Sequence, residues 1–177
     1  KLIAQYAYRY QDACKQWVAE DEFVVRLRHL TAQRDRIVRN IKVMEVPIGE
    51  LEQTGSQAIA KELEKIQRKA VQELKQAIKA IEKKISELVE NHETARDKIA
   101  LVKSIKGIST QTATHLYVYT KGFQTFENAK QLASYCGVVP FDRKSGISVR
   151  HRPRVSAYAN KDLKRLLHLC AMCAIRH

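Results

Sequence analysis

The amino-acid sequence predicts an all-α or mainly α protein, in which a long antiparallel helical hairpin or coiled coil precedes a small helical domain. Apolar residues recur at helical spacing through most of the first hundred positions. After that point the composition becomes strongly basic, and glycine and proline punctuate the most basic stretch. We therefore expect a helical hairpin or coiled-coil dimerisation region at residues 1–100 and a separate C-terminal domain at residues 101–177.

Length and composition limit the class of protein. The chain has 177 residues, of which 45% are hydrophobic, so it can build a core and wholesale disorder is excluded. No apolar run reaches the roughly 18 residues of a membrane span, and no signal peptide opens the chain. We expect a soluble, intracellular protein. Lys1 already lies inside an apolar helical pattern, which suggests a piece of a longer protein.

The first arm of the predicted hairpin is a stripe of apolar residues that Arg34 interrupts. Its members lie at helical spacing: Phe23, Leu27, Leu30, Ile37, Ile41 and Met44. The turn-forming sequence Pro47-Ile48-Gly49, followed by Gly55-Ser56, then predicts a connection that reverses the chain.

The second arm is predicted to be one continuous helix over residues 59–102. Apolar or small residues recur there at steps of three or four, and the other faces carry alternating Glu and Lys. Such a helix would be on the order of 65–70 Å long and would overhang the first arm. An apolar stripe that one partner leaves uncovered favours a homodimer or higher oligomer, although a helical bundle within one monomer remains an alternative.

The four cysteines are predicted to be reduced thiols, and the last two are predicted to be buried apolar thiols that hold no metal. The four lie at Cys14, Cys136, Cys170 and Cys173 in a chain too large to need disulfides. The last two have CxxC spacing, but they lie in an apolar helical run, and no second CxxC or His pair completes a tetrahedral site.

Positive charge is concentrated in the last part of the chain. Residues 101–177 hold thirteen Lys and Arg against three Asp and Glu, whereas residues 45–100 hold ten against eleven. The densest stretch, residues 143–165, lies in a loop with glycine and proline, which favours a phosphate backbone as partner. A solvated basic face or a patch for a membrane surface is the alternative interpretation.

Residues 101–119 match a helix-hairpin-helix pattern around Gly107-Ile108-Ser109. In such a turn the free backbone N–H groups at the start of the next helix can bind a phosphate, so Lys106, Gly107 and Ser109 are candidate contacts. Ser109 replaces the usual second glycine. A plain helix–turn–helix joint without a ligand remains an equal alternative.

A series of motifs then follows in a characteristic order: Gly122-Phe123, Phe126, Ala129, Gln131-Leu132-Ala133, Tyr135, Gly137-Val138-Val139-Pro140, Ser145-Gly146, Ser156 to Asn160, and Asp162-Leu163-Lys164-Arg165-Leu166-Leu167. This series resembles the C-terminal domain of the DEDD-type insertion-sequence transposases. In that family a RuvC-like nuclease domain and a coiled coil precede the small domain, and the members recombine DNA.

The resemblance extends to residue 1, because a Lys-Leu-Ile-Ala stretch follows the last acidic motif of the RuvC-like domain in the family. It implies that this domain, with its four carboxylates and a divalent metal such as Mg²⁺, lies upstream, so that this chain needs no metal and is inactive alone. DNA is the implied partner, and the implied location is the prokaryotic cytosol or nucleoid. Some members also use a structured guide RNA, and the sequence leaves open whether this one does.

Within the family the small domain supplies a serine nucleophile, which the motif order places at Ser145, with Ser148 and Ser156 as fallbacks. A serine that attacks a phosphodiester needs nearby cations. Candidate nucleic-acid contacts besides the hairpin turn are Arg143, Lys144, Arg150, Arg152, Arg154, Asn160, Lys161, Lys164 and Arg165. Two positions depart from the family: Ala157-Tyr158-Ala159 replaces a basic residue and glycine before Asn160, and Lys164 replaces an arginine.

Two other functions remain open at this stage. The first is a non-catalytic helix-hairpin-helix module that binds nucleic acid and carries a coiled-coil dimerisation arm. The second is a coiled-coil scaffold whose basic tail binds an acidic protein.

Overall fold

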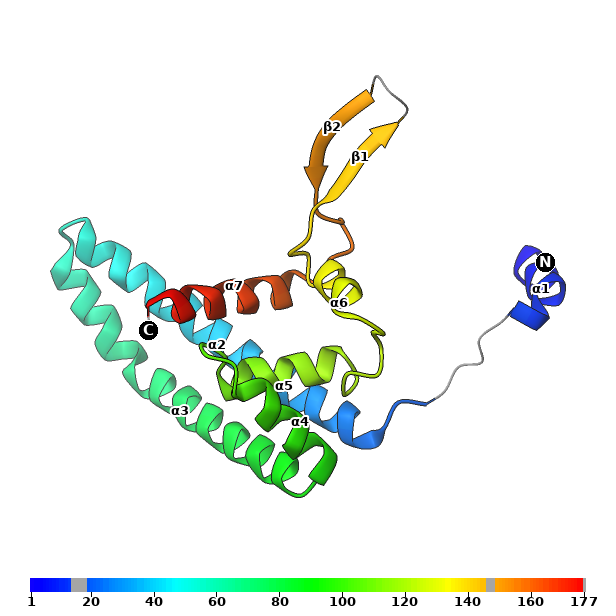
Figure 1. The fold of residues 1–177 in the computed structure, drawn as a ribbon. Helices are drawn as coiled ribbons and strands as arrows, with labels where there is room; N and C mark the ends of the chain where they lie inside the picture. Colours follow the sequence, from blue (N-terminus) through cyan, green and yellow to red (C-terminus); the bar gives the residue numbers. More distant parts are fainter. Residues whose placement is uncertain (14–18, 146–148, 177) are drawn as a thin grey trace.

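The computed structural model describes the backbone of residues 1–13, 19–145 and 149–176, and the side chains of these residues except 13, 142–145 and 149–151. It is mainly α-helical, as the sequence predicts, and contains the long helical hairpin (Figure 1). In chain order the elements are α1 (Leu2–Arg9), a 3₁₀ turn (Gln11–Ala13), α2 (Glu22–Gln53), α3 (Gln57–Glu90), α4 (Glu93–Lys103), α5 (Thr110–Tyr119), α6 (Ala129–Tyr135), β1 (Phe141–Ser145), β2 (Val149–Arg154) and α7 (Lys161–Arg176).

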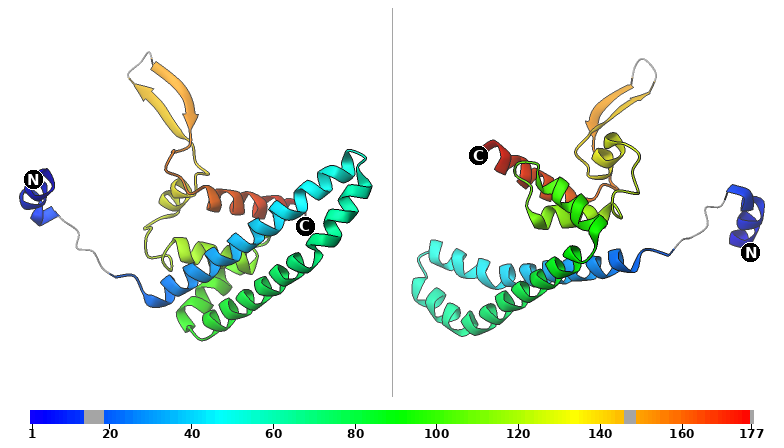
Figure 2. Two further views of the ribbon diagram at one scale, coloured as in Figure 1. Left: turned by 180° about the vertical axis from the view of Figure 1, so that it is seen from behind. Right: turned by 60° about the horizontal axis from the view of Figure 1, so that its bottom comes forward.

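Helices α2 and α3 form the antiparallel hairpin and lie side by side in both views of Figure 2. The chain reverses at Gly55, whose φ of 84° is left-handed, while Ser56 N–H donates to the Leu51 carbonyl at 2.9 Å. This is a glycine-dependent helix C-cap. The turn expected at Pro47-Ile48-Gly49 is wrong, because Pro47 lies within α2.

The prediction of one helix over residues 59–102 is also wrong, since α3 ends at Glu90 and α4 begins at Glu93. His92 is the N-cap of α4 and its Nδ1 accepts from the Ala95 N–H at 3.3 Å. With this break α3 has 34 residues against 32 in α2, so the expected overhang is absent from these two helices. The apolar stripe keeps its phase across the break, and spacing therefore could not reveal it.

Helix α5 lies at the centre of the helical body. Residues 112–118 are all buried, which is typical of a helix covered on every side. One face joins a cluster with residues of α2, α3 and α4, namely Val24, Leu27, Ile85, Val89, Ala95 and Ile99. The other contributes Leu116 to a second cluster with Cys136 and Leu163. The first cluster crosses the boundary expected at residue 100.

The basic stretch that the sequence predicted as a loop contains a two-stranded antiparallel ribbon, within a fold that is mainly α-helical as predicted. The ribbon projects away from the helical body between α6 and α7 (Figures 1 and 2). Strand pairing satisfies the backbone of a segment that extends beyond the core. None of the helices in the described ranges is long and apolar enough to cross a membrane.

Candidate nucleic-acid interface

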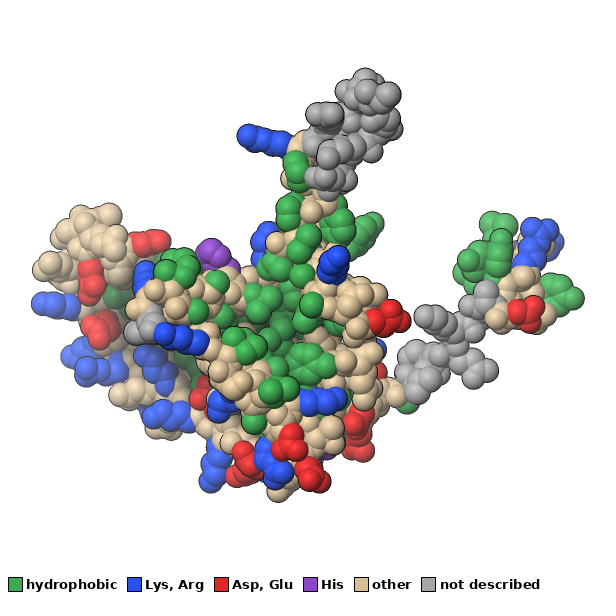
Figure 3. All heavy atoms as spheres, in the orientation of Figure 1, with side chains coloured by type: hydrophobic (Ala, Val, Ile, Leu, Met, Phe, Trp, Pro, Cys, Tyr) green, Lys and Arg blue, Asp and Glu red, His purple; other side chains and the backbone are tan. Residues whose placement is uncertain are grey.

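The ribbon carries much of the basic sequence. Its register pairs Arg143 with His151 and Lys144 with Arg150, whose side chains lie outside the described residues. Arg152 and Arg154 on β2 are exposed, and Lys or Arg side chains are visible along the ribbon and at its base (Figure 3). A twisted pair of strands with cations along it can follow a phosphate backbone.

Two of the three candidate serines lie in the ribbon or at its base. The backbone of Ser145 is the last residue of β1, opposite Val149, and its side chain is outside the described residues. Ser148 lies wholly outside them. Ser156 follows β2, and its Oγ accepts a hydrogen bond from the Tyr158 N–H at 3.2 Å.

Gly137 fixes the base of the ribbon against the start of α7. Its φ is 67°, and a Cβ at this position would lie 2.7 Å from Ala159 Cβ and 3.0 Å from Val155 Cγ1. Any larger residue would therefore force these segments apart. The glycine of the Gly-Val-Val-Pro motif thus has a packing role.

Asn160 connects α6 to α7. Its N–H donates to the Tyr135 carbonyl at 2.7 Å and its Nδ2 to Tyr135 Oη at 3.1 Å. Its Oδ1 accepts from the Leu163 N–H at 3.0 Å, so Asn160 is the N-cap of α7. These contacts hold the exposed cations Lys161, Lys164 and Arg165 beside the base of the ribbon.

The turn of the predicted helix-hairpin-helix, at Gly107, lies against the other end of α7. Gly107 has a φ of 88°, and a Cβ there would lie 2.6 Å from the Cys170 carbonyl oxygen. Ser109 caps α5 through Oγ, which accepts from the Thr112 N–H at 3.2 Å. Gly107 therefore packs on α7, about 14 Å along the helix from Lys161. The structure brings together the candidates of the ribbon and of residues 152–165, and it separates Lys106, Gly107 and Ser109 from them.

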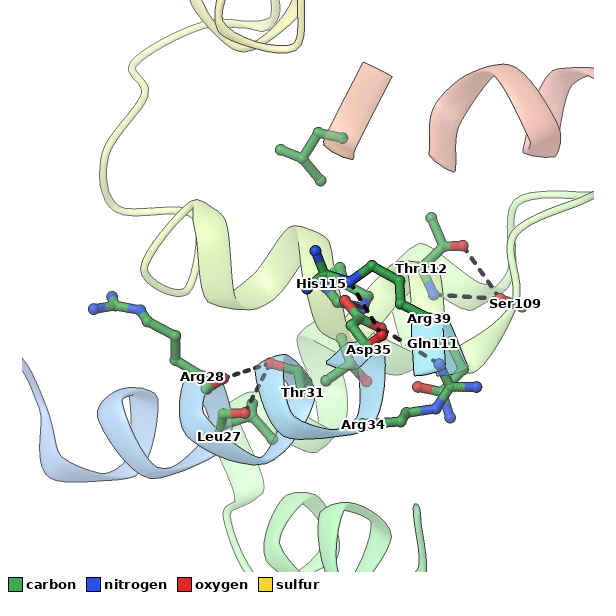
Figure 4. Close-up of polar contacts among 12 residues, drawn as sticks. Leu27, Arg28, Thr31, Arg34, Asp35, Arg39, Ser109, Gln111, Thr112 and His115 are labelled. Carbon is green, nitrogen blue, oxygen red and sulfur yellow. Dashed lines mark hydrogen bonds and ion pairs between the residues drawn. The ribbon is translucent and has the colours of Figure 1, made fainter. Parts of the chain in front are cut away.

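A polar network between α2 and α5 was missed in the sequence. His115 is buried, and its Nε2 lies 3.4 Å from Asp35 Oδ2 (Figure 4). Burial alone would raise the pKa of Asp35, but the His115 hydrogen bond and the charges of His115, Arg34 and Arg165 together lower it below its ordinary value. The charge of Arg165 on α7 thus acts on Asp35 in α2 of the hairpin.

The same network explains why Arg34 interrupts an apolar stripe. Its Nε donates to Glu82 Oε1 across the hairpin at 2.7 Å, and Gln111 Nε2 of α5 donates to the same oxygen at 3.2 Å. Tyr119, one turn beyond His115, has its pKa raised by burial and by the Asp162 carboxylate of α7. The sequence signal that could have revealed this network was a charged residue, Arg34, within an otherwise apolar stripe.

The cysteines are free thiols where the structure describes them. Cys136 is buried, which raises its pKa, and Cys170 Sγ lies 3.6 Å from Thr112 Oγ1. The prediction of a buried thiol is wrong for Cys173, which is exposed, and Cys14 lies outside the described residues. Within the described part of the chain, no three His, Cys, Asp or Glu residues are grouped to hold a metal ion.

Comparison with known proteins gives one family and three curated relatives. The sequence profile of the transposase IS116/IS110/IS902 family matches residues 99–177. The chain is 24% identical over 156 residues to the pilin gene-inverting protein of Moraxella bovis, which covers 88% of this chain and 46% of that protein. The pilin gene-inverting protein of Moraxella lacunata is 33% identical over 75 residues, which cover 42% of this chain and 23% of that protein.

The third relative is the insertion element IS110 uncharacterized 43.6 kDa protein of Streptomyces coelicolor. It is 32% identical over 99 residues, which cover 55% of this chain and 23% of the relative. The chain thus spans less than half the length of each of these relatives.

Proposed function

From the membership of this chain in the transposase IS116/IS110/IS902 family, we propose that it works in a DNA transposase or recombinase, binds DNA and supplies a serine for strand transfer. The observation that carries the proposal is the coincidence of two features. The family match covers residues 99–177, and the same residues present exposed cations on the ribbon and on the first turn of α7.

DNA binding is proposed at the ribbon and the start of α7. Arg152, Arg154, Lys161, Lys164 and Arg165 are exposed there, so they can neutralise phosphates without first breaking buried contacts. Affinity should then fall steeply with salt, by about 0.9 in log K per phosphate for each unit of log salt concentration. The same measurement with a structured RNA decides whether a guide RNA is a second partner.

Strand transfer is proposed to use Ser145. Its oxygen forms a bond to phosphorus and its proton passes to water, while the bond from phosphorus to one sugar oxygen breaks and that oxygen takes up a proton. The ribbon arginines stabilise the charge that develops on the phosphoryl oxygens. Divalent metal, when bound, would stabilise the same charge, and we propose that it is held outside this chain.

Ser145→Ala tests this chemistry in the protein that carries the chain. We expect DNA joining to fall by at least about a thousandfold, while salt-dependent binding to duplex DNA, measured by fluorescence anisotropy, is unchanged. Ser148→Ala, which changes the first fallback serine in the same stretch, should join DNA normally, and loss of joining in this variant alone would move the nucleophile to Ser148.

Loss of joining only in Ser156→Ala would move the nucleophile to the base of the ribbon. Full joining by all three serine variants would contradict serine catalysis. A protein that binds DNA and joins none, with or without these changes, would be the non-catalytic binding module instead.

We further propose that the chain forms a homodimer through the hairpin. Four large apolar residues are exposed on the half of the hairpin near its turn: Val43, Val46, Ile59 and Ile66. Exposed apolar surface of this kind on paired helices is typically covered by a second copy. These exposed residues, and not the overhang that the sequence predicted, are the reason to expect a dimer.

A further inference from the structure

A hollow of about 490 Å³ lies where the ribbon joins the helical body. Its walls come from α6, both strands and the turn that follows β2, and they include Tyr135, Phe141, Arg154, Val155, Ser156 and Tyr158. Its volume lies in the range of ligand sites, and its walls combine aromatic, apolar and cationic side chains.

Tyr158 stands beside this hollow almost entirely in water, with 96% of its surface exposed. Its backbone is nonetheless fixed, because its N–H donates to Ser156 Oγ at 3.2 Å and the Ala159 N–H donates to the Ser156 carbonyl at 3.2 Å. Asn160, held by Tyr135, closes the turn. A ring that is presented by an ordered turn loses little further freedom on binding.

The charge around the hollow suits an anion. Arg154 is exposed and pairs with Phe141 in the ribbon register. The described residues that line the hollow include no Asp or Glu.

We propose that the hollow receives one unpaired nucleotide, whose base stacks on Tyr158 and whose phosphate lies against Arg154. The inference rests on the proposed function, because it places this nucleotide in nucleic acid that the ribbon binds. A base inside a duplex has both faces covered by its neighbours and cannot stack on a side chain. An extruded or single-stranded base offers a free face, and every base has one, so the site selects unpaired structure and not sequence.

The test compares two duplexes that differ by one bulged nucleotide. We expect the unaltered chain to bind the bulged duplex about tenfold more tightly than the fully paired one, as judged by anisotropy at one salt concentration. Tyr158→Ala should abolish this preference and leave affinity for the paired duplex unchanged. Tyr158→Phe keeps the ring and should keep the preference. Tyr8→Ala, which removes another exposed tyrosine, is the matched control and should change neither affinity.

A second measurement locates the base directly. A photoreactive 5-iodouracil at the bulged position should crosslink to Tyr158, as identified by mass spectrometry, and should not crosslink when it is paired. Equal affinity for the two duplexes, a preference that survives Tyr158→Ala, or a crosslink elsewhere would overturn this inference and leave the proposed function intact. Failure of the unaltered chain to bind either duplex would overturn both.

Discussion

At the scale of single residues, Glu20 joins the start of α2 to the end of α5. Its carboxylate lies 2.6 Å from Arg28 Nη1 and 2.7 Å from Lys121 Nζ. Hydrogen bonds with Arg28 and then Lys121 lower the pKa of Glu20 from 4.5 to about 2. The charged form is therefore favoured in the folded state, and the stability it adds is fully present above about pH 4.5 and is lost as the pH falls through about 2.

We expect Glu20→Gln to lower the thermal midpoint slightly at neutral pH and to flatten the fall in that midpoint between about pH 4.5 and 2. Because Arg28 and Lys121 are both solvent-accessible, 1 M salt should shrink the difference. Thermal unfolding followed by circular dichroism across a pH series measures this. Glu62→Gln on the exposed side of α3 is the control, and identical pH profiles for both variants would contradict the role of Glu20.

At the scale of elements, the turn between α2 and α3 depends on the backbone conformation of Gly55 and not on side-chain packing around it. Gly55 has a left-handed φ of 84°, and no atom lies within 4 Å of where its Cβ would be. Gly49, inside α2, also has open space around it but is helical. The two glycines therefore separate the conformational effect of an added methyl group from its steric effect.

Gly55→Ala should lower the free energy of unfolding by about 1 kcal/mol, because alanine is strained in the left-handed region. Gly49→Ala should raise it by about 0.5–1 kcal/mol, because alanine favours helix. Denaturant titrations give both values. A stabilising Gly55→Ala would mean that the chain does not reverse at this residue.

At the scale of the whole molecule, the proposed homodimer depends on the outer surface of the hairpin. Ile66→Glu places a charge on a side chain that is already 69% exposed, so the monomer should fold normally. We expect its dimer dissociation constant, from sedimentation velocity over a concentration series, to rise by at least about tenfold.

Leu101→Glu is the matched control, since Leu101 is similarly exposed at 72% but belongs to α4 and not to α2 or α3. A dimer that tolerates Ile66→Glu but is broken by Leu101→Glu would move the interface to α4. A chain that sediments as a monomer at every concentration would contradict the dimer itself.

Much of the architecture follows from local sequence. The apolar stripes that begin at Phe23 and Ile59 predicted both arms, because a period of 3.6 depends only on neighbours within one turn. The basic excess after residue 100 likewise predicted where exposed cations lie. The break at His92 escaped prediction because the stripe continues in phase on both sides of it, and the ribbon escaped because its charged residues give no clear alternation.

The sequence by itself determined the helical class, the reversal of the chain, the basic C-terminal part and the family motifs. Only the tertiary structure decided which of those motifs meet. Gly107 and Gly137 both allow close approach to α7, but at opposite ends of it. The turn at Gly107 and the ribbon therefore form separate surfaces. The Asp35–His115 pair and the hollow beside Tyr158 likewise arise only when the chain folds, because each brings together residues that are far apart in the sequence. The physical reason is that helix periodicity and charge are properties of adjacent residues, whereas packing joins side chains as far apart as Thr112 and Cys170.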